Sequence, residues 1–388
     1  MSGSAEDSVT TVCLMGTATS DQQYRRVAEL REGLLANGYR VRDCRFGLPH
    51  RGVREQGRVL ALLTYLAGLF RAWLKIYRRF RAFDGVDVIV VPYPAHLDVF
   101  MARWLARGRG VPVVMDAFLR LHDTIVADRK LLPPSSYRAR LVLGFEQRSL
   151  ACADRILIDT PAQARSLVEV FPQLQGRIHA LPLRIDADLW RCRRAPDSNE
   201  FRVLFWGTFI PLHGVETVVS AAALVAAHTP RIKFEVVGNG QTADQVQALI
   251  NQLKPPNLDW TRKILPPDVI AAKAQQAHCV LGIFGGSEKA ASVVPYKVYQ
   301  GLAAGRVIVT RHGPAIEEIL ESGRSAVLVP PQNAQALADA VVSLSEHPGL
   351  ARQIAERGQA VFEDRLSKSV ADRVLGEVIE SAIGRAVR

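Results

Sequence analysis

The sequence is poor in cysteine and has no spaced cysteine motif. Its five cysteines are scattered along 388 residues, and none forms a C-x-x-C pair. This pattern indicates neither a structural zinc site nor a thiol redox motif. A sparse, odd cysteine count is typical of a protein in a reducing cytosol. The histidines also lie far apart in the sequence, so we expect no metal site.

Long apolar runs are absent as well. No stretch of about 18 uncharged apolar residues occurs, so no segment is expected to span a membrane. The opening "MSGSAEDSVTTVCLMG" lacks the basic flank and the long apolar core of a signal peptide. These absences together favour a cytoplasmic protein.

Acidic residues are outnumbered by basic ones. The 49 lysines and arginines against 38 aspartates and glutamates give a net charge of +11. Such a charge favours anionic partners such as anionic lipid, phosphorylated substrates or nucleic acid. An alternative is an ordinary basic soluble protein. Because no aromatic-interleaved basic sheet or known reading motif occurs, we expect no nucleic-acid partner.

Apolar strand-like runs alternate with helical patterns along the whole chain. This rhythm is typical of an α/β fold with parallel, doubly wound sheets. It breaks at 184–200, which is polar and charged and contains Pro196, and then restarts. We therefore predict two α/β domains of similar size joined by a linker. The predicted strands include 10–17, 86–94, 111–118 and 153–160 in the first half, then "RVLFWGT", "IKFEVVGNG" and "RVIVTR" in the second.

The segment 57–83 differs from this rhythm. It is long, apolar and aromatic, and its second half is dense in cations. This composition predicts a basic amphipathic helix that lies in an anionic membrane interface. The alternative is a helix whose apolar stripe packs on its own domain. The apolar residues at helical spacing are Leu66, Leu69, Phe70, Trp73, Ile76, Tyr77 and Phe80.

In open α/β domains, ligands bind at the loops after the strands. The first loops of the two halves are "MGTATSDQQ", with Gly16 and Thr17, and "WGTFIPLHG", with Gly207, Thr208 and His213. Neither loop contains a complete G-x-G-x-x-G fingerprint or a Walker motif. Dinucleotide binding and P-loop ATP chemistry are therefore disfavoured.

The motifs of the second half follow one another at regular intervals: "VLFWGTFIPLHGVETVVSAA", "FEVVGNGQ", "ILPPDVI", "VLGIFGG", "PYKVYQGLAAGRVIVTR" and "GPAIEEIL". This order resembles the donor domain of a family-4 glycosyltransferase of GT-B architecture, and the first half resembles the acceptor domain more loosely. The resemblance implies an acceptor domain at 1–190 and a donor domain at 191–364. It also implies a C-terminal helix at 365–388 that crosses back to the first domain.

The sequence departs from the family pattern at four positions. The two family glutamates, eight residues apart, are replaced by Ser292 and Gln300, and an amide at Gln300 can still bind a ribose hydroxyl. The Arg and Lys that neutralise the donor diphosphate in the family are replaced by Thr208 and His213. A histidine can supply one donor there, whereas a threonine supplies no charge.

Two lysines can replace the lost cations. Lys289 and Lys297 flank the loop that leads into the "YKVYQG" helix. An ammonium is a good point-charge partner for phosphate, and a helix N-terminus favours anions. We interpret the pair as relocated diphosphate clamps that take the place of a metal ion. The alternative is that both lysines are solvated surface groups.

The remaining candidates follow from the same resemblance. Asn239 and Ile264 are expected beside the nucleotide base, although Asn239 is also a suitable turn residue. Glu318 is expected to reach the ribose or to cap a helix. On the acceptor side, Asp116 and Asp123 are candidates for positioning or deprotonating the acceptor hydroxyl, with His96 as a second choice. Asp116, or Phe118 if the strand is shifted, stands where the family has a histidine.

The resemblance predicts a retaining, metal-independent glycosyltransferase that uses a nucleoside-diphosphate sugar as co-substrate and needs no cofactor. The 57–83 segment favours a lipid-linked or cell-envelope glycan as acceptor, at the inner face of the cell membrane. Two alternatives remain open. One is a sugar-nucleotide epimerase with the same architecture, and the other is a non-catalytic subunit that binds a nucleotide or a glycan.

Overall fold

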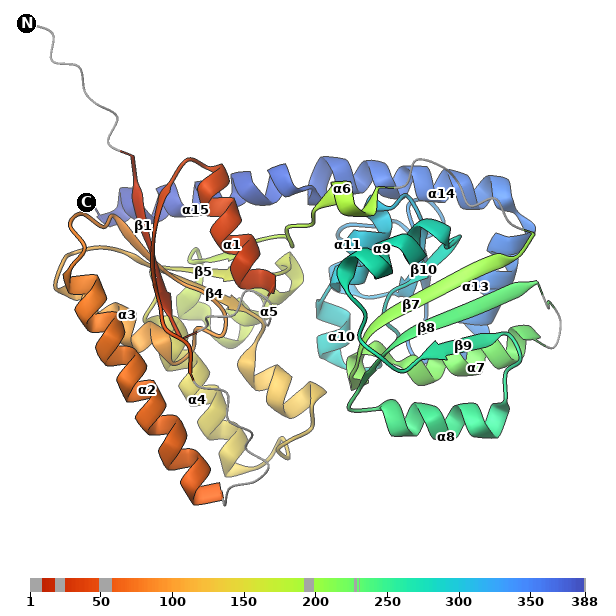
Figure 1. Cartoon of the computed structure of the whole chain (residues 1–388), viewed down its shortest axis with the longest axis horizontal. Helices are drawn as coiled ribbons and strands as arrows, with labels where there is room; N and C mark the ends of the chain where they lie inside the picture. The colour runs from red at the N-terminus through yellow and green to blue at the C-terminus, as the bar shows by residue number, and fades with distance from the viewer. Residues whose placement is uncertain are drawn as a thin grey trace, which may run out of the picture.

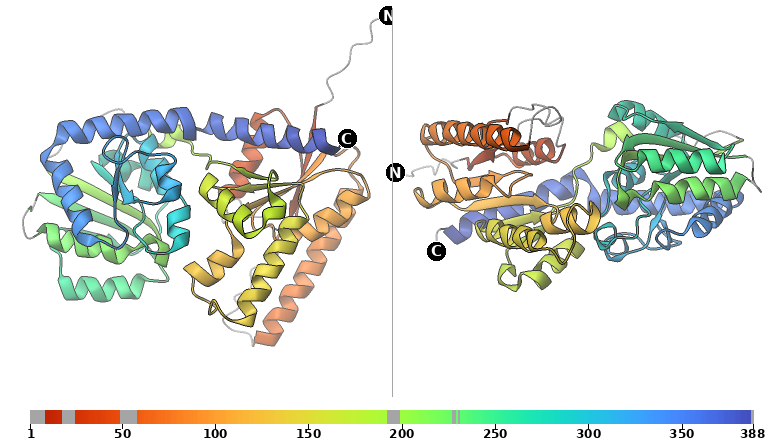
Figure 2. Two further views of the ribbon diagram at one scale, coloured as in Figure 1. Left: turned by 180° about the vertical axis from the view of Figure 1, so that it is seen from behind. Right: turned by 90° about the horizontal axis from the view of Figure 1, so that it is seen from below.

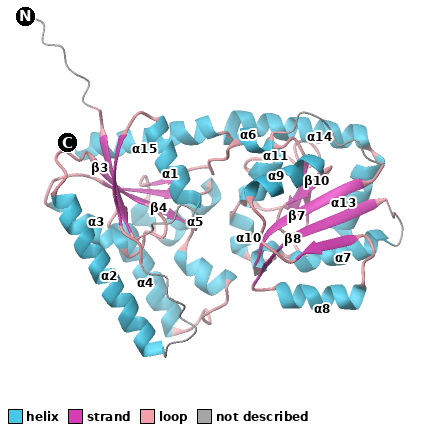
Figure 3. Cartoon of the chain, viewed as in Figure 1, coloured by secondary structure: helices cyan, strands magenta, loops and turns pink. Residues whose placement is uncertain are grey.

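The structure is a computed structural model, and it describes residues 9–17, 25–48, 58–191, 199–226, 229 and 231–386. Within these ranges the chain forms two parallel six-stranded sheets with helices on both faces (Figures 1 and 3). The doubly wound α/β architecture predicted from the sequence is confirmed. No helix of the described ranges combines the length and the apolar character that crossing a bilayer requires.

The first sheet has the order β2-β1-β3-β4-β5-β6. Successive side chains of a strand point to opposite faces, so Cys13 and Met15 enter one core while Val12 and Leu14 enter the other. Its strands are β1 (Thr11–Gly16), β2 (Arg40–Arg45), β3 (Val88–Val91), β4 (Val113–Phe118), β5 (Arg155–Ile158) and β6 (Ile178–Ala180).

Different helices cover the two faces of this sheet. One face is covered by α2 (Arg58–Arg81), α3 (Asp98–Arg107), α4 (Tyr137–Ala151) and α5 (Pro161–Val170). The other is covered by α1 (Arg25–Ala36) and by the last helix, α15 (Lys368–Ala386). Two short helices, η1 (Asp123–Asp128) and η2 (Pro172–Leu174), follow β4 and α5.

The second sheet has the order β12-β11-β10-β7-β8-β9. Its strands are β7 (Phe201–Phe209), β8 (Ile232–Gly240), β9 (Leu258–Thr261), β10 (Cys279–Leu281), β11 (Val307–Arg311) and β12 (Val327–Val329). Its helices are α6 (Ala187–Trp190), η3 (Pro211–His213), α7 (Val215–Ala226), α8 (Ala243–Leu253), α9 (Pro267–Gln276), α10 (Glu288–Ser292), α11 (Tyr296–Ala303), α12 (Pro314–Glu317), α13 (Ala334–Glu346), α14 (Pro348–Val361) and η4 (Phe362–Leu366).

The chain passes between the two sheets twice. On the first passage, the stretch expected to be only a polar linker contains α6, whose Trp190 is buried and stacks on Trp206 of β7 with ring centroids 5.7 Å apart. On the second, α14, η4 and α15 run along one side of both domains (Figures 1 and 2). Leu375 and Ile379 of α15 then pack into the core of the first sheet.

Candidate active site

Gly207 lies in the last third of β7, beside Gly238 of β8. Its φ of 145° belongs to a region that only glycine adopts without strain. A Cβ atom here would lie 3.2 Å from the Nζ atom of Lys297 and 3.1 Å from the Cε1 atom of His213. The absence of a Cβ atom therefore lets these two side chains approach the β7 backbone closely. We call Gly207, His213 and Lys297 the lysine–histidine slot.

Lys297 stands in the first turn of α11 and is almost completely buried. Its Nζ atom lies 3.7 Å from the centroid of the Phe205 ring, and no hydrogen-bond partner is found for it within the described ranges. Burial lowers the pKa of Lys297 well below its usual range. A buried amine without a partner is costly, which makes this side chain a strong candidate for ligand binding.

His213 ends the short helix η3, where Gly214 follows in the left-handed conformation. The ring is buried, and its Nδ1 atom has no partner among the described residues. Burial and the nearby Lys297 charge lower the pKa of His213 well below its usual range. The slot thus contains two nitrogen atoms without bonds that an anion can engage.

Gln300 follows Lys297 by one helical turn, as the sequence indicates. Its Oε1 atom accepts a hydrogen bond of 3.3 Å from the indole Nε1 atom of Trp206. The side chain is buried, so the amide is held in one orientation by the β7 strand. This placement is compatible with the ribose contact expected from the sequence.

Lys289 is placed differently from Lys297. Its Nζ atom donates to the Thr124 hydroxyl at 2.8 Å and lies 3.7 Å from the Asp128 carboxylate. Both partners belong to η1 of the first domain, so Lys289 joins the two domains in this structure. Lys289 therefore has protein partners, whereas the Nζ atom of Lys297 has none among the described residues.

The other donor-side candidates are more exposed. Thr208 is exposed at the end of β7, and Ile264 is 73% exposed. The Asn239 side chain accepts from the Gly240 amide at 2.9 Å, which is the bonding of a turn residue. Glu318 pairs with Arg165 of α5 in the first domain.

Asp116 and His96 are both engaged inside the first domain. Asp116 is fully buried and receives a bond of 3.1 Å from the Arg26 guanidinium. The His96 Nδ1 atom lies 2.8 Å from the Ser149 hydroxyl, and burial lowers the pKa of His96 to about 4. Asp116 is therefore already paired, whereas the Nε2 atom of His96 has no partner among the described residues.

Among the three candidates for the acceptor-side base, Asp116, Asp123 and His96, Asp123 is the most accessible to solvent. It begins η1, and its carboxylate pairs with Arg120 at 2.9 Å while one quarter of the side chain remains exposed. Buried Glu146 holds this segment by accepting from the amides of Leu121 and His122. Burial raises the pKa of Glu146 to about 7.

Gly16 is the last residue of β1 and Thr17 follows it, and we call these two residues the acceptor turn. Both Thr17 donors, the amide and the hydroxyl, bind one oxygen of Asp98 at 2.7 and 2.8 Å. The sequence alone did not indicate Asp98. The only sequence signal for Asp98 is its position: it is an acidic residue two positions after His96, in the segment that follows β3.

The segments after the strands of both sheets touch each other. The Tyr296 hydroxyl donates to Glu29 at 2.9 Å, and the Thr160 hydroxyl donates to the Ser292 carbonyl at 2.7 Å. Because α10 and α11 face the first domain, the slot lies on the side of the second sheet that is turned toward the first (Figure 1). This is the region where ligands bind in open α/β sheets.

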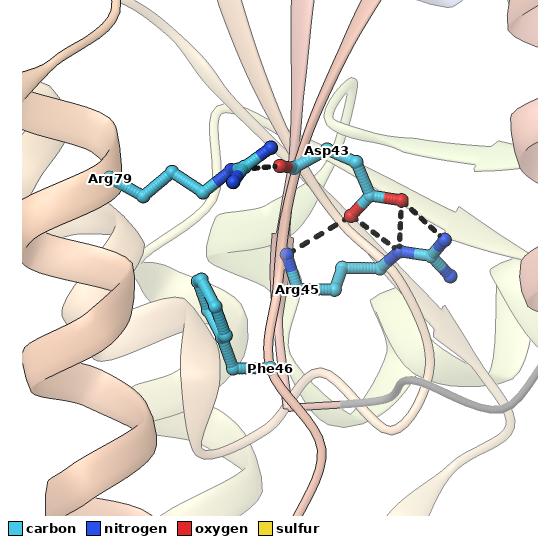
Figure 4. A pocket seen from close by; sticks show the side chains of 4 residues that line it. All are labelled: Asp43, Arg45, Phe46 and Arg79. Carbon is cyan, nitrogen blue, oxygen red and sulfur yellow. Dashed lines mark hydrogen bonds and ion pairs between the residues drawn. The ribbon is translucent and has the colours of Figure 1, made fainter.

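A separate hollow of about 250 Å³ lies at the edge strand β2. Figure 4 shows Arg79 reaching from α2 to the Asp43 carbonyl, while the Asp43 carboxylate pairs with Arg45. Phe46 completes the lining. Arg79 belongs to the 57–83 segment, but none of the site residues predicted from the sequence lines this hollow, and its charged groups already bind one another.

Metal-ligating side chains do not cluster in the described part of the chain. No group of three or more His, Cys, Asp or Glu residues there has the arrangement to hold an ion. The four cysteines of the described ranges are free.

Comparison with known proteins agrees with this geometry. A model of the family "Glycosyl transferases group 1" matches residues 200–347, and a model of a "Glycosyl transferase 4-like domain" matches 12–184. The D-inositol 3-phosphate glycosyltransferase of Kribbella flavida is 25% identical over 335 residues, which are 81% of this chain and 74% of that protein.

Two solved structures share the fold at 15% identity. Sucrose-phosphate synthase from Thermosynechococcus elongatus superposes with a TM-score of 0.73, covering 97% of this chain and 100% of that one. HepE from Anabaena, solved in complex with UDP, superposes with a TM-score of 0.66 over 96% of this chain and 100% of that one. Since the two family models together span most of its length, this chain belongs to the group 1, family-4-like glycosyltransferases of GT-B fold and is a transferase enzyme.

Proposed function

We propose that this transferase moves a sugar from a nucleoside-diphosphate sugar to a hydroxyl of a lipid-linked or cell-envelope glycan, with retention of configuration and without a metal ion. The observation that carries the proposal is the buried Nζ atom of Lys297, which has no bonding partner within the described ranges and borders Gly207. An anion in the slot would give this amine the partner that the protein does not supply.

The donor diphosphate is the anion that fits this position best. The slot lies at the end of β7 and at the first turn of α11, where backbone amides also favour negative charge. Lys297 and His213 together can neutralise the leaving diphosphate, which is the role a metal ion plays in other transferases. HepE, which has the same fold, was solved with UDP, and this supports a UDP-sugar as the first donor to test.

On the acceptor side, we assign the positioning or deprotonation of the hydroxyl to Asp123. Its carboxylate pairs with Arg120 but stays one quarter exposed, whereas Asp116 is fully buried in its pair with Arg26. A carboxylate can accept a proton in a concerted step when it lies within hydrogen-bond reach.

The proposed acceptor and location rest on α2. Its buried face, with Ile76 and Phe80, packs on the first sheet. A second apolar face remains in solvent, and we call it the apolar face of α2: Leu63, Leu66, Phe70 and Leu74, which are 57%, 49%, 69% and 39% exposed. At 3.6 residues per turn, exposed Arg71, Lys75 and Arg78 form a strip beside it. Apolar residues flanked by cations suit the surface of an anionic bilayer.

The test is donor turnover by purified protein with a panel of UDP-, GDP- and ADP-sugars, with and without EDTA. We expect sugar release or transfer with at least one donor, unaffected by EDTA, with retained configuration by NMR. Lys297→Met should lower turnover by about 100-fold or more, since removing one preorganised charge costs this much. Exposed Lys368→Met is the matched control and should have no effect.

Three results would contradict the proposal. They are no turnover with any donor, a product that is only an isomerised nucleotide sugar, or full activity in Lys297→Met. The second result would indicate an epimerase, and the first a non-catalytic binding subunit.

A further inference from the structure

Asp98 connects two parts of the first domain that belong to different functions in the proposal above. Its Oδ2 atom accepts from the Thr17 amide at 2.7 Å and from the Thr17 hydroxyl at 2.8 Å. Its Oδ1 atom accepts from the Trp73 indole Nε1 atom at 3.0 Å. One carboxylate therefore holds the acceptor turn with one oxygen and helix α2 with the other.

The burial of Asp98 makes these bonds strong. The residue is only 2% exposed, so its charge depends on these three donors for stabilisation. Asp98 is the first residue of α3, but its carboxylate does not cap that helix. The side chain instead turns toward Gly16, where an added Cβ atom would lie 3.0 Å from Oδ2.

Trp73 is half-buried and lies on α2 between the buried residues Leu69 and Ile76. On its C-terminal side, Ile76 and Phe80 are fixed in the core of the first sheet. On its N-terminal side, Leu66 and Phe70 are exposed, and the N-terminal end of α2 projects beyond the sheet (Figures 1 and 3). The indole of Trp73 therefore links α2, whose other face carries the exposed apolar residues, to the buried carboxylate of Asp98.

We propose that Asp98 is a positioning residue that couples helix α2 to the acceptor turn, so that docking of α2 on an anionic bilayer sets the position of Gly16 and Thr17. Trp73 is then a link to the interior and not a membrane anchor, and the bilayer is contacted by the apolar face of α2. The inference rests on the proposed docking of α2 and on the acceptor role of the turn.

Hydrogen exchange at the Thr17 amide tests the coupling without any substrate. Trp73→Phe keeps a ring but removes the indole donor, and Asp98→Asn cannot accept from both sides at once. In both variants we expect the Thr17 amide hydrogen to exchange about tenfold faster than in the wild type. This factor corresponds to the weakening of one charge-assisted hydrogen bond. Trp104→Phe is the matched control: Trp104 is 58% exposed, and the phenyl ring can keep the ring contact with Tyr77 of α2. Unchanged exchange in Trp73→Phe would overturn the proposal.

Vesicles test the direction of the coupling. Vesicles of equal parts phosphatidylglycerol and phosphatidylcholine should change the Thr17 exchange rate in the wild type and in Trp104→Phe, but not in Trp73→Phe. Pure phosphatidylcholine should leave all three unchanged. If the wild type binds the anionic vesicles while its Thr17 exchange stays constant, the coupling is wrong. If the wild type does not sediment with the anionic vesicles, the proposed docking of α2 on a membrane is wrong. The Thr17 exchange rates of Trp73→Phe and Asp98→Asn then decide by themselves whether Asp98 positions the acceptor turn.

UDP binding separates this inference from the donor site. Calorimetric titration with UDP should give the same affinity for wild type, Trp73→Phe and Asp98→Asn, because Asp98 lies in the first domain and the slot in the second. A global loss of structure would instead weaken UDP binding in both variants. Equal UDP affinity together with faster Thr17 exchange therefore supports a local positioning role, and weakened UDP binding contradicts it.

Discussion

At the residue scale, the free protein keeps a lysine where its charge is disfavoured. Lys297 is buried with no partner in the described part of the structure, and the Phe205 ring is its nearest polarisable neighbour. Burial lowers its pKa well below the usual range, and His213 is shifted in the same direction. The slot is therefore a place where protonation and ligand binding must be linked.

We predict that UDP binding takes up protons and weakens as pH rises. In the free protein burial lowers the pKa of the Lys297 amine, whereas a bound diphosphate favours the ammonium form and raises the pKa again. Binding is tightest below the lowered pKa and falls by up to about tenfold per pH unit between the free and the bound values. Calorimetry at about pH 8 in two buffers with different ionisation enthalpies measures the proton uptake.

Lys297→Met supplies the control for this linkage. The variant should bind UDP weakly and with less proton uptake, and it should melt about 2–4 °C higher, since it removes a buried amine without a partner. Equal proton uptake in the variant and the wild type would assign the linkage to His213 or to the nucleotide itself.

At the scale of elements, the sequence predicted the strands well and the role of α2 only in part. Continuous apolar runs such as Val88–Val91 must be buried on both faces, so their strand character follows from local sequence. For α2, spacing revealed an apolar stripe but not which part of it the domain covers. Leu69, Ile76 and Phe80 are buried, whereas Leu66 and Phe70 are exposed. That division depends on which face of α2 is turned toward the sheet.

The site residues too could be predicted from the sequence only where the contact is local. Lys297 and Gln300 stand in one local motif, so their proximity could be read from the sequence. Asp98 and Glu146 could not be identified in this way, because their partners Thr17 and Leu121 are 81 and 25 residues away. Lys289 has a local motif, yet its partners come from the other domain.

We predict that the apolar face of α2 contributes to vesicle binding and that its buried face does not. Leu66→Glu combined with Phe70→Glu should reduce sedimentation with anionic vesicles by about tenfold or more, because two apolar contacts are lost and two repulsive charges are added. The melting temperature should change little, as both side chains are exposed. Leu350→Glu is the control, since Leu350 is 45% exposed on α14, far from α2 in the sequence. Equal loss of binding in Leu350→Glu would show a nonspecific charge effect.

At the scale of the whole molecule, the two domains are held by several polar contacts of different quality. Lys289 and Asp128 are 6% and 1% exposed as side chains, and their pairing is therefore poorly screened. Arg165 and Glu318 form a second pair across the interface, but 60% of the Arg165 side chain is exposed. Burial distinguishes the two pairs, because removing one partner of a buried pair leaves a charge without compensation.

We predict that Asp128→Asn destabilises the protein by on the order of 2 kcal/mol, and Arg165→Ala by less than about 1 kcal/mol. Burial already lowers the pKa of Lys289, and the loss of the Asp128 charge lowers it further, so the amine is left with the Thr124 hydroxyl as its contact.

Adding Lys289→Met to Asp128→Asn should recover much of the lost stability, because the unpaired amine is gone. Differential scanning calorimetry of the wild type, Asp128→Asn, Lys289→Met and the double variant gives the coupling. If the double variant is no more stable than Asp128→Asn, the Lys289–Asp128 pair does not hold the domains together, and Lys289 is again available for the donor diphosphate. UDP affinity of Lys289→Met decides that case: it stays within about threefold of the wild type if Lys289 serves the interface.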